Sequence, residues 1–134
     1  LLYGENRLDK NDGYNVGMVH SNLCEDSHNC TAVMGFFGGW SGPSVVAGAE
    51  YNTKEVANIS STLTSVYANY TMSEHLSTFV RMDSNDSDSD IDIDKEDTTW
   101  IGFTWTPIEG LDICPNIMQT DDDDTFAVNF QFKF

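Results

Sequence analysis

The sequence predicts an all-β fold: an antiparallel up-and-down β-barrel of about eight strands, without a helix. Apolar and polar side chains alternate along most of the chain, and this period of two places successive side chains on opposite faces of a strand. Short and longer connections also alternate between these segments, as in a meander with turns at one rim and loops at the other. Aromatic residues recur near the short connections.

The alternation is clearest at the C-terminus. Phe126, Val128, Phe130 and Phe132 share one parity there, whereas the intervening positions are mostly polar. The same pattern predicts strands over about residues 14–20, 31–40, 45–52, 66–72, 76–83, 100–106, 111–117 and 125–134. Short connections at 41–44, 73–75 and 107–110 then alternate with longer polar connections at about 22–30, 53–61, 84–97 and 120–124.

Length and charge limit the classes of protein that fit. The chain has 134 residues, so we expect residues 1–134 to form a single β-barrel domain or the C-terminal segment of a larger barrel. Lys and Arg total 6 against 22 Asp and Glu, and the resulting net charge of −16 repels nucleic-acid phosphates. We therefore expect no nucleic-acid partner.

Acidic residues gather in or beside the longer connections, at one predicted rim. Fifteen of the 22 lie there: Glu25, Asp26, Glu55, Asp83, Asp86, Asp88, Asp90, Asp92, Asp94, Glu96, Asp97, Asp121, Asp122, Asp123 and Asp124. An anionic pore mouth concentrates cations and disfavours anions, so these residues predict cation preference if the barrel has a pore.

Large aromatic side chains on the apolar face gather at the opposite rim, beside the short connections. They are Tyr14, Trp40, Tyr70, Trp105, Phe132 and Phe134. Aromatic rings at one level around a barrel are typical of a girdle at a membrane interface, and they favour a transmembrane barrel in contact with the lipid bilayer. The alternative is that aromatic residues are simply frequent in strands.

The other face of the predicted strands is mostly polar. It would line a hydrophilic lumen in a membrane barrel and would face water in a soluble barrel, so it does not separate the two. The candidate lumen-facing residues are Glu50, Asn52, Tyr67, Asn69, Arg81, Asp112, Asn116, Asn129, Gln131 and Lys133.

Three segments carry a resemblance to a known family: VYANYTMSEHL (66–76), FVRMD (79–83) and IGFTWTPIEGL (101–111), followed by Pro115 and Asn116. They resemble the closing strands of porin-like outer-membrane β-barrel proteins of Gram-negative bacteria, over roughly residues 44–134. The resemblance implies a location in the bacterial outer membrane, with short turns toward the periplasm and acidic loops outside. It also implies that barrel-insertion machinery recognises the terminal strand, 126–134, and that a homo-oligomer can form.

One acidic run offers oxygen ligands of the kind that Ca²⁺ prefers. The candidate ligands of a weak, adventitious Ca²⁺ site are Asp86, Asp88, Asp90, Asp92 and Asp94. The run is not an EF-hand, because Ile91 stands where that loop needs Gly. The alternative is a solvated loop without metal, and we expect no other cofactor.

Three cysteines allow at most one intramolecular disulfide. Cys24 and Cys30 lie close enough in sequence to form it in an oxidising compartment. They could also bind a soft metal together with His28, or remain free thiols. We assign no role to Cys114.

No arrangement of residues predicts catalysis. Gly39-Trp40-Ser41-Gly42-Pro43 departs from the Gly-x-Ser-x-Gly elbow at its last position, and the three histidines fall on different elements. We therefore expect a protein that is not an enzyme.

The function that fits best is an outer-membrane, porin-like channel for passive diffusion of small hydrophilic solutes, with a preference for cations. Glu50, Arg81, Asp112 and Lys133 in the lumen and the acidic loops would set its selectivity. Two alternatives stay open. One is a small non-conducting outer-membrane barrel whose acidic loops serve structural or partner contacts, and the other is a soluble secreted β-barrel that binds Ca²⁺ or a small ligand.

Overall fold

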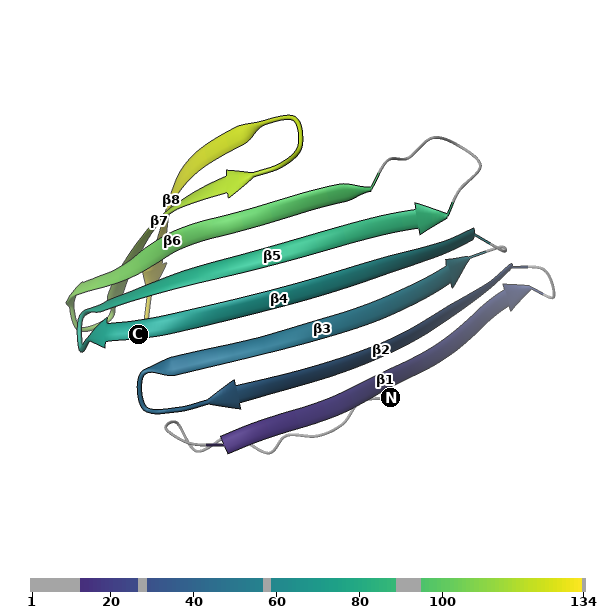
Figure 1. Ribbon diagram of the computed structural model, residues 1–134, viewed down its shortest axis with the longest axis horizontal. Coiled ribbons are helices and arrows are strands. Elements are labelled where there is room, and N and C mark those ends of the chain that lie inside the picture. The colour runs from purple at the N-terminus through teal and green to yellow at the C-terminus, as the bar shows by residue number, and fades with distance from the viewer. Residues whose placement is uncertain (1–12, 27–28, 57–58, 89–94, 134) are drawn as a thin grey trace.

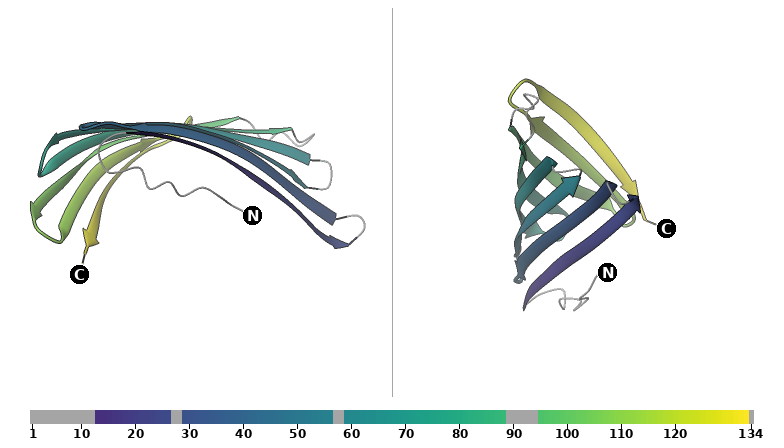
Figure 2. Two further views of the ribbon diagram at one scale, coloured as in Figure 1. Left: turned by 90° about the horizontal axis from the view of Figure 1, so that it is seen from below. Right: turned by 90° about the vertical axis from the view of Figure 1, so that its right-hand side faces the viewer.

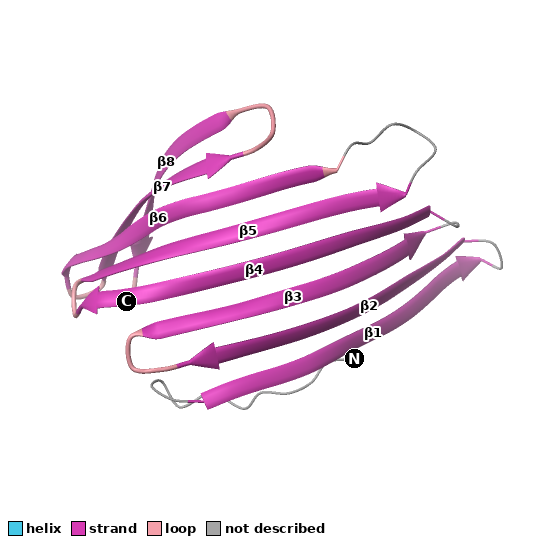
Figure 3. Cartoon of the chain, viewed as in Figure 1, coloured by secondary structure: helices cyan, strands magenta, loops and turns pink. Residues whose placement is uncertain are grey.

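A computed structural model of the chain describes residues 13–26, 29–56, 59–88 and 95–133 (Figure 1). These residues form eight strands, coloured as such in Figure 3. The strands are β1 (Gly13–Asp26), β2 (Asn29–Ser41), β3 (Val45–Val56), β4 (Ile59–Ser73), β5 (Leu76–Asp88), β6 (Glu96–Ile108), β7 (Leu111–Gln119) and β8 (Asp124–Phe132). Within the described ranges no helix is long and apolar enough to cross a membrane.

The strands form one antiparallel sheet in which each strand pairs with the next along the chain. The order β1 to β8 has no crossover, so the predicted up-and-down arrangement of eight strands is confirmed. The sheet curves strongly, and Figure 2 shows it as an arched wall rather than a closed cylinder. β1 and β8 are not neighbours in the sheet, which is therefore open, as in part of a larger barrel.

The strands extend beyond the predicted ranges at the rim with the longer connections, and the predicted loops there are wrong in extent. Val56 pairs with Ile59, and Ser60 pairs with Asp88, within the segments 53–61 and 84–97 that the sequence assigns to connections. The physical reason is that backbone pairing continues past the last apolar residue, because polar Ser and Thr side chains also fit a pleated surface. Glu55, Asp83, Asp86, Asp88 and Asp97 consequently lie on strands.

The short connections occupy the predicted rim. Gly110, in the turn between β6 and β7, has a φ of 86°, a left-handed conformation that favours glycine. Pro107 lies within β6, where the pairing register shifts between Trp105 and Ile108. A proline has no N–H to donate, so it is tolerated at this irregularity near the strand end.

The two faces of the sheet differ in chemistry and in burial. The side chains that are buried in the described structure are Ser41, Ser65, Asp112 and Asn116, and the register places all four on the polar face. Curvature crowds side chains on the inside of an arch and spreads them on the outside, so the polar face is the concave one. No apolar side chain of the described residues is buried.

Candidate functional site

The convex face carries a continuous zone of exposed apolar side chains, which we call the apolar band. Its larger members are 37% to 79% exposed. They are Tyr14, Val16, Met18, Met34, Phe36, Trp40, Tyr51, Val66, Tyr70, Met72, Val80, Met82, Ile101, Phe103, Trp105, Ile117, Phe126, Val128, Phe130 and Phe132.

The apolar band runs obliquely across the strands. Directly paired residues form a row from Tyr14 through Trp40, Ala47, Ala68, Val80, Ile101 and Ile117 to Phe126. Tyr14 lies at the short-turn end of β1, whereas Phe126 lies near the opposite end of β8, six positions before Phe132. We call the edge of the band toward the short turns its lower edge and the edge toward the longer connections its upper edge. A row perpendicular to the strands therefore crosses the band from its lower edge on β1 to its upper edge on β8.

This drift gives the angle between the strands and the perpendicular to the apolar band. Six residues of about 3.3 Å over seven strand spacings of about 4.8 Å correspond to a tilt of about 30°. Strands of membrane barrels tilt by about 35–45° from the barrel axis. The angle between the strands and the perpendicular to the apolar band is therefore close to the strand tilt of membrane barrels.

The predicted girdle residues lie on the convex face near the short turns. Tyr14 pairs directly with Trp40, and both are exposed. Tyr70, Trp105 and Phe132 lie on the same face and are about half exposed or more. Phe134 lies outside the described residues.

The register places every predicted lumen-facing residue on the concave face. Tyr67 pairs with Arg81, and Asp112 pairs with Gln131. The remaining members are Glu50, Asn52, Asn69, Asn116 and Asn129, which share this parity on their strands, and Lys133, which directly follows β8 and pairs with Asp112.

A polar cluster occupies the middle of the concave face. Arg81 Nε donates to both carboxylate oxygens of Asp83, at 2.9 and 3.0 Å, and the Ser65 hydroxyl donates to the same carboxylate. The Arg81 guanidinium also lies 6.0 Å from the centre of the Trp100 ring. Such contacts hold the Arg81 side chain against the wall.

A second cluster lies near the short turns. Asp112 accepts a hydrogen bond from Thr106 at 2.7 Å and pairs with Lys133 Nζ at 2.6 Å. It thereby joins β6, β7 and the end of β8. Two of the basic side chains on the concave face, Arg81 and Lys133, are thus neutralised by neighbouring carboxylates.

Sequence reasoning missed three members of these clusters, Ser65, Trp100 and Thr106, and assigned Asp83 to the acidic rim. Parity was the available signal for Asp83, because it is two positions from Arg81 on one strand and therefore shares its face. The Ser65 contact depends on the register between β4 and β5, which the sequence alone does not specify.

The candidate Ca²⁺ ligands are only partly covered by the structure. Asp86 and Asp88 lie on β5, whereas Asp90, Asp92 and Asp94 fall outside the described residues. No group of three potential ligands occurs in the described part of the chain. The Ca²⁺ site in the acidic run therefore stays a prediction.

Cys24 and Cys30 are directly paired residues of β1 and β2, and their sulfur atoms are bonded. This disulfide closes the connection between the two strands at the rim with the longer loops. Cys114 is a free thiol on β7, and His28 lies outside the described residues.

Comparisons with solved structures give a structural likeness to a transmembrane β-barrel. No protein-family model and no curated protein matches this chain. A solved structure described as de novo design of transmembrane β-barrels is similar, with a TM-score of 0.42 and 12% sequence identity. The alignment covers 90% of this chain and 93% of that one. At this identity nothing about function carries over.

Proposed function

We propose that this chain forms the wall of a porin-like β-barrel in the bacterial outer membrane, through which small hydrophilic solutes diffuse passively. The observation that carries the proposal is the placement of the apolar band on the convex face, opposite a concave face with polar clusters. A barrel in lipid needs an apolar exterior, and a water-filled passage needs a polar interior.

The same placement argues against a soluble β-barrel that binds a ligand inside. A soluble barrel turns its apolar residues inward to form a core. Here most of the large exposed apolar side chains lie on the convex face, where Trp40, Phe36 and Ile101 are each about half exposed, and fewer, such as Val46, lie on the concave face. A lipid bilayer covers such a surface, whereas water leaves it a liability for aggregation.

The outer edges of β1 and β8 must be paired for the sheet to reside in lipid. Each unpaired backbone N–H or C=O group costs roughly several kcal/mol in the hydrocarbon region, because no water is present to hydrogen-bond it. We propose that these edges pair with each other or with further strands that complete a larger barrel. The intact mass of the native polypeptide in a detergent extract of membranes separates the two arrangements.

The proposed cation preference arises mainly at the acidic rim. On the concave face, Arg81 and Lys133 offset Asp83 and Asp112, so the wall itself has little net charge. The turn between β7 and β8 instead exposes Asp121, Asp122 and Asp123, three carboxylates against one nearby basic side chain, Lys95. The partners in this proposal are the bilayer, the solutes and the barrel-insertion machinery, which would recognise β8.

Reversal potential in a planar bilayer under a salt gradient tests the proposal. We expect a potential of the sign that cation selectivity gives, and a smaller potential when Asp121, Asp122 and Asp123 are all changed to Asn. The control is Glu109→Gln, which neutralises an exposed carboxylate at the opposite rim, in the turn between β6 and β7, and is expected to leave the potential unchanged. Anion selectivity would disprove the charge argument, and a protein that inserts but never conducts would support the alternative of a closed, non-conducting barrel.

A further inference from the structure

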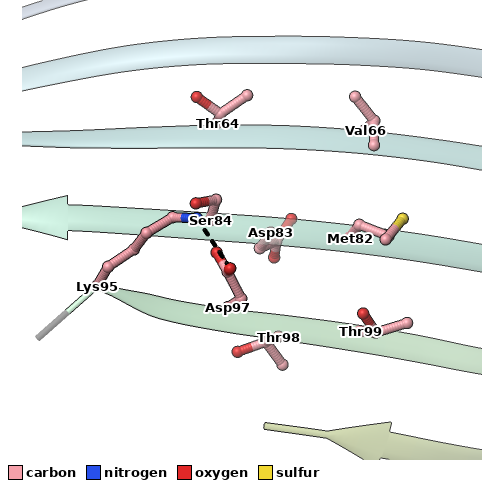
Figure 4. Close-up of a pocket in the computed structure, with 9 residues that line it drawn as sticks. All are labelled: Thr64, Val66, Met82, Asp83, Ser84, Lys95, Asp97, Thr98 and Thr99. Carbon is pink, nitrogen blue, oxygen red and sulfur yellow. Dashed lines mark hydrogen bonds and ion pairs between the residues drawn. The ribbon is translucent and has the colours of Figure 1, made fainter. Parts of the chain in front are cut away.

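A shallow groove on the convex face crosses the upper boundary of the apolar band. Its volume is about 300 Å³, and it spans β4, β5 and the start of β6 (Figure 4). Two neighbouring rows of directly paired residues form its floor. Val66, Met82 and Thr99 make the lower row, and Thr64, Ser84 and Asp97 make the upper one.

The two rows have different chemistry. The lower row exposes the apolar side chains of Val66 and Met82, and the strands below it continue into the apolar band. The upper row exposes hydroxyl groups and a carboxylate. The groove therefore passes from apolar to polar over two residues of each strand, which is how a bilayer changes from acyl chains to headgroups.

A basic side chain lies over the polar row. Lys95, immediately before β6, extends toward Ser84, and its Nζ lies 2.9 Å from Asp97 Oδ2 (Figure 4). Asp97 accepts one of the three N–H groups of the ammonium, so two remain for a ligand. The hydrogen bond and charge of Asp97, aided by Asp86 and Asp121, raise the pKa of Lys95 and keep it protonated.

We infer that this groove binds the phosphate group of a membrane lipid, with Lys95 and the hydroxyl of Thr64 as donors and with Val66 and Met82 against the acyl chain. Lys95 and Thr64 lie at the level where a lipid places its phosphate. Among the described residues that line the groove, Lys95 is the one with a basic side chain. The inference rests on the proposed contact between the convex face and lipid.

Native mass spectrometry of the full chain in detergent tests this inference. The probes are phosphatidic acid and diacylglycerol with identical acyl chains, which differ only in the phosphate. We expect the wild type to retain phosphatidic acid in preference to diacylglycerol, and Lys95→Gln to reduce that preference about tenfold, because a charge-assisted hydrogen bond contributes about that factor. The control is Lys54→Gln, which removes the same charge from the concave face.

Each outcome decides between the proposals. An unchanged preference in Lys95→Gln, or an equal reduction in Lys54→Gln, would overturn the lipid site. Glycerol 3-phosphate that binds as well as phosphatidic acid would show a site for free phosphate and would also overturn it. A protein that inserts into bilayers but shows no preference would leave the membrane wall intact, whereas failure to insert would remove both proposals.

Discussion

Tyr67 lies directly against Gly48, its partner on the neighbouring strand of the concave face. A methyl group added at Gly48 would stand 2.5 Å from both Cζ and Oη of Tyr67. The aromatic ring therefore covers the bare backbone of a glycine, and the two residues fit only as a pair.

Gly48→Ala is expected to lower the free energy of unfolding by about 1–2 kcal/mol, because overpacking forces the ring or the strands apart. Urea titration of the folded protein in lipid or detergent measures the change. Gly38→Ala is the control, since a methyl group there meets its nearest atoms at 3.8 Å, an ordinary contact. Equal effects of the two substitutions would show that the Tyr67 contact is not the cause.

Ala68 and Asn69 are adjacent in β4 but lie on opposite faces, so one substitution in two places separates lipid from lumen. Ala68 sits in the middle of the apolar band. We expect Ala68→Lys to destabilise the inserted protein by about 2–4 kcal/mol, as basic residues do near the bilayer midplane. Asn69→Lys on the concave face is expected to change stability by less than about 1 kcal/mol.

Unfolding from lipid vesicles in guanidinium chloride measures both Ala68→Lys and Asn69→Lys. The larger loss at Asn69 would mean that the concave face is the dry one. That result would reverse the assignment of the two faces and support the soluble alternative.

Asp97 carries a pH dependence that follows from its contacts. Hydrogen bonds from Ser84 and from Lys95 lower the pKa of this carboxyl below its ordinary value, and the charge of Lys95 acts in the same direction. A carboxylate with a lowered pKa in the folded state stabilises that state above its unfolded pKa. The contribution is lost as the pH falls through the folded pKa.

NMR titration of the Asp97 side-chain carboxyl is expected to give a midpoint below that of an unfolded aspartate. Ser84→Ala removes the larger cause and is expected to raise the midpoint. Thr98→Ala, on the same strand but the opposite face, is expected to leave it unchanged. A titration midpoint that stays unchanged in Ser84→Ala would mean that the Ser84 hydroxyl does not reach Asp97 in solution.

The bond between Cys24 and Cys30 gives a chemical prediction. Alkylation of the unfolded, unreduced protein is expected to modify one thiol per chain, that of Cys114, and three after reduction. Replacing both bonded cysteines with Ser is expected to lower the free energy of unfolding by about 2 kcal/mol, because the loop they close is short. Three reactive thiols before reduction would contradict the pairing.

The sequence was sufficient to assign faces, because parity alone separates residues such as Ala68 from Asn69. It also located the short turns and the order of the strands. It could not set strand ends, because polar segments such as 84–88 pair through their backbones without an apolar signal. Contacts between strands, such as Ser65 with Asp83 or Thr64 beside Ser84, depend on register, which residue periodicity leaves open by steps of two.

The oblique apolar band makes the orientation of the strands measurable. If the band lies level in a bilayer, the row from Tyr14 to Phe126 is inclined to the membrane plane, and the strands tilt from the membrane normal by about 30–45°. Polarised infrared spectroscopy of the amide I band in oriented bilayers reports this angle directly. Strands parallel to the membrane normal would place Tyr14 and Phe126 at the same depth. Tyr14 lies at the short-turn edge of the apolar band on β1, and Phe126 lies at the opposite edge of the band on β8. The band would then cross the membrane obliquely, and part of it would lie outside the lipid. That result would refute the membrane wall, and a tilt in the expected range would support it independently of any conductance.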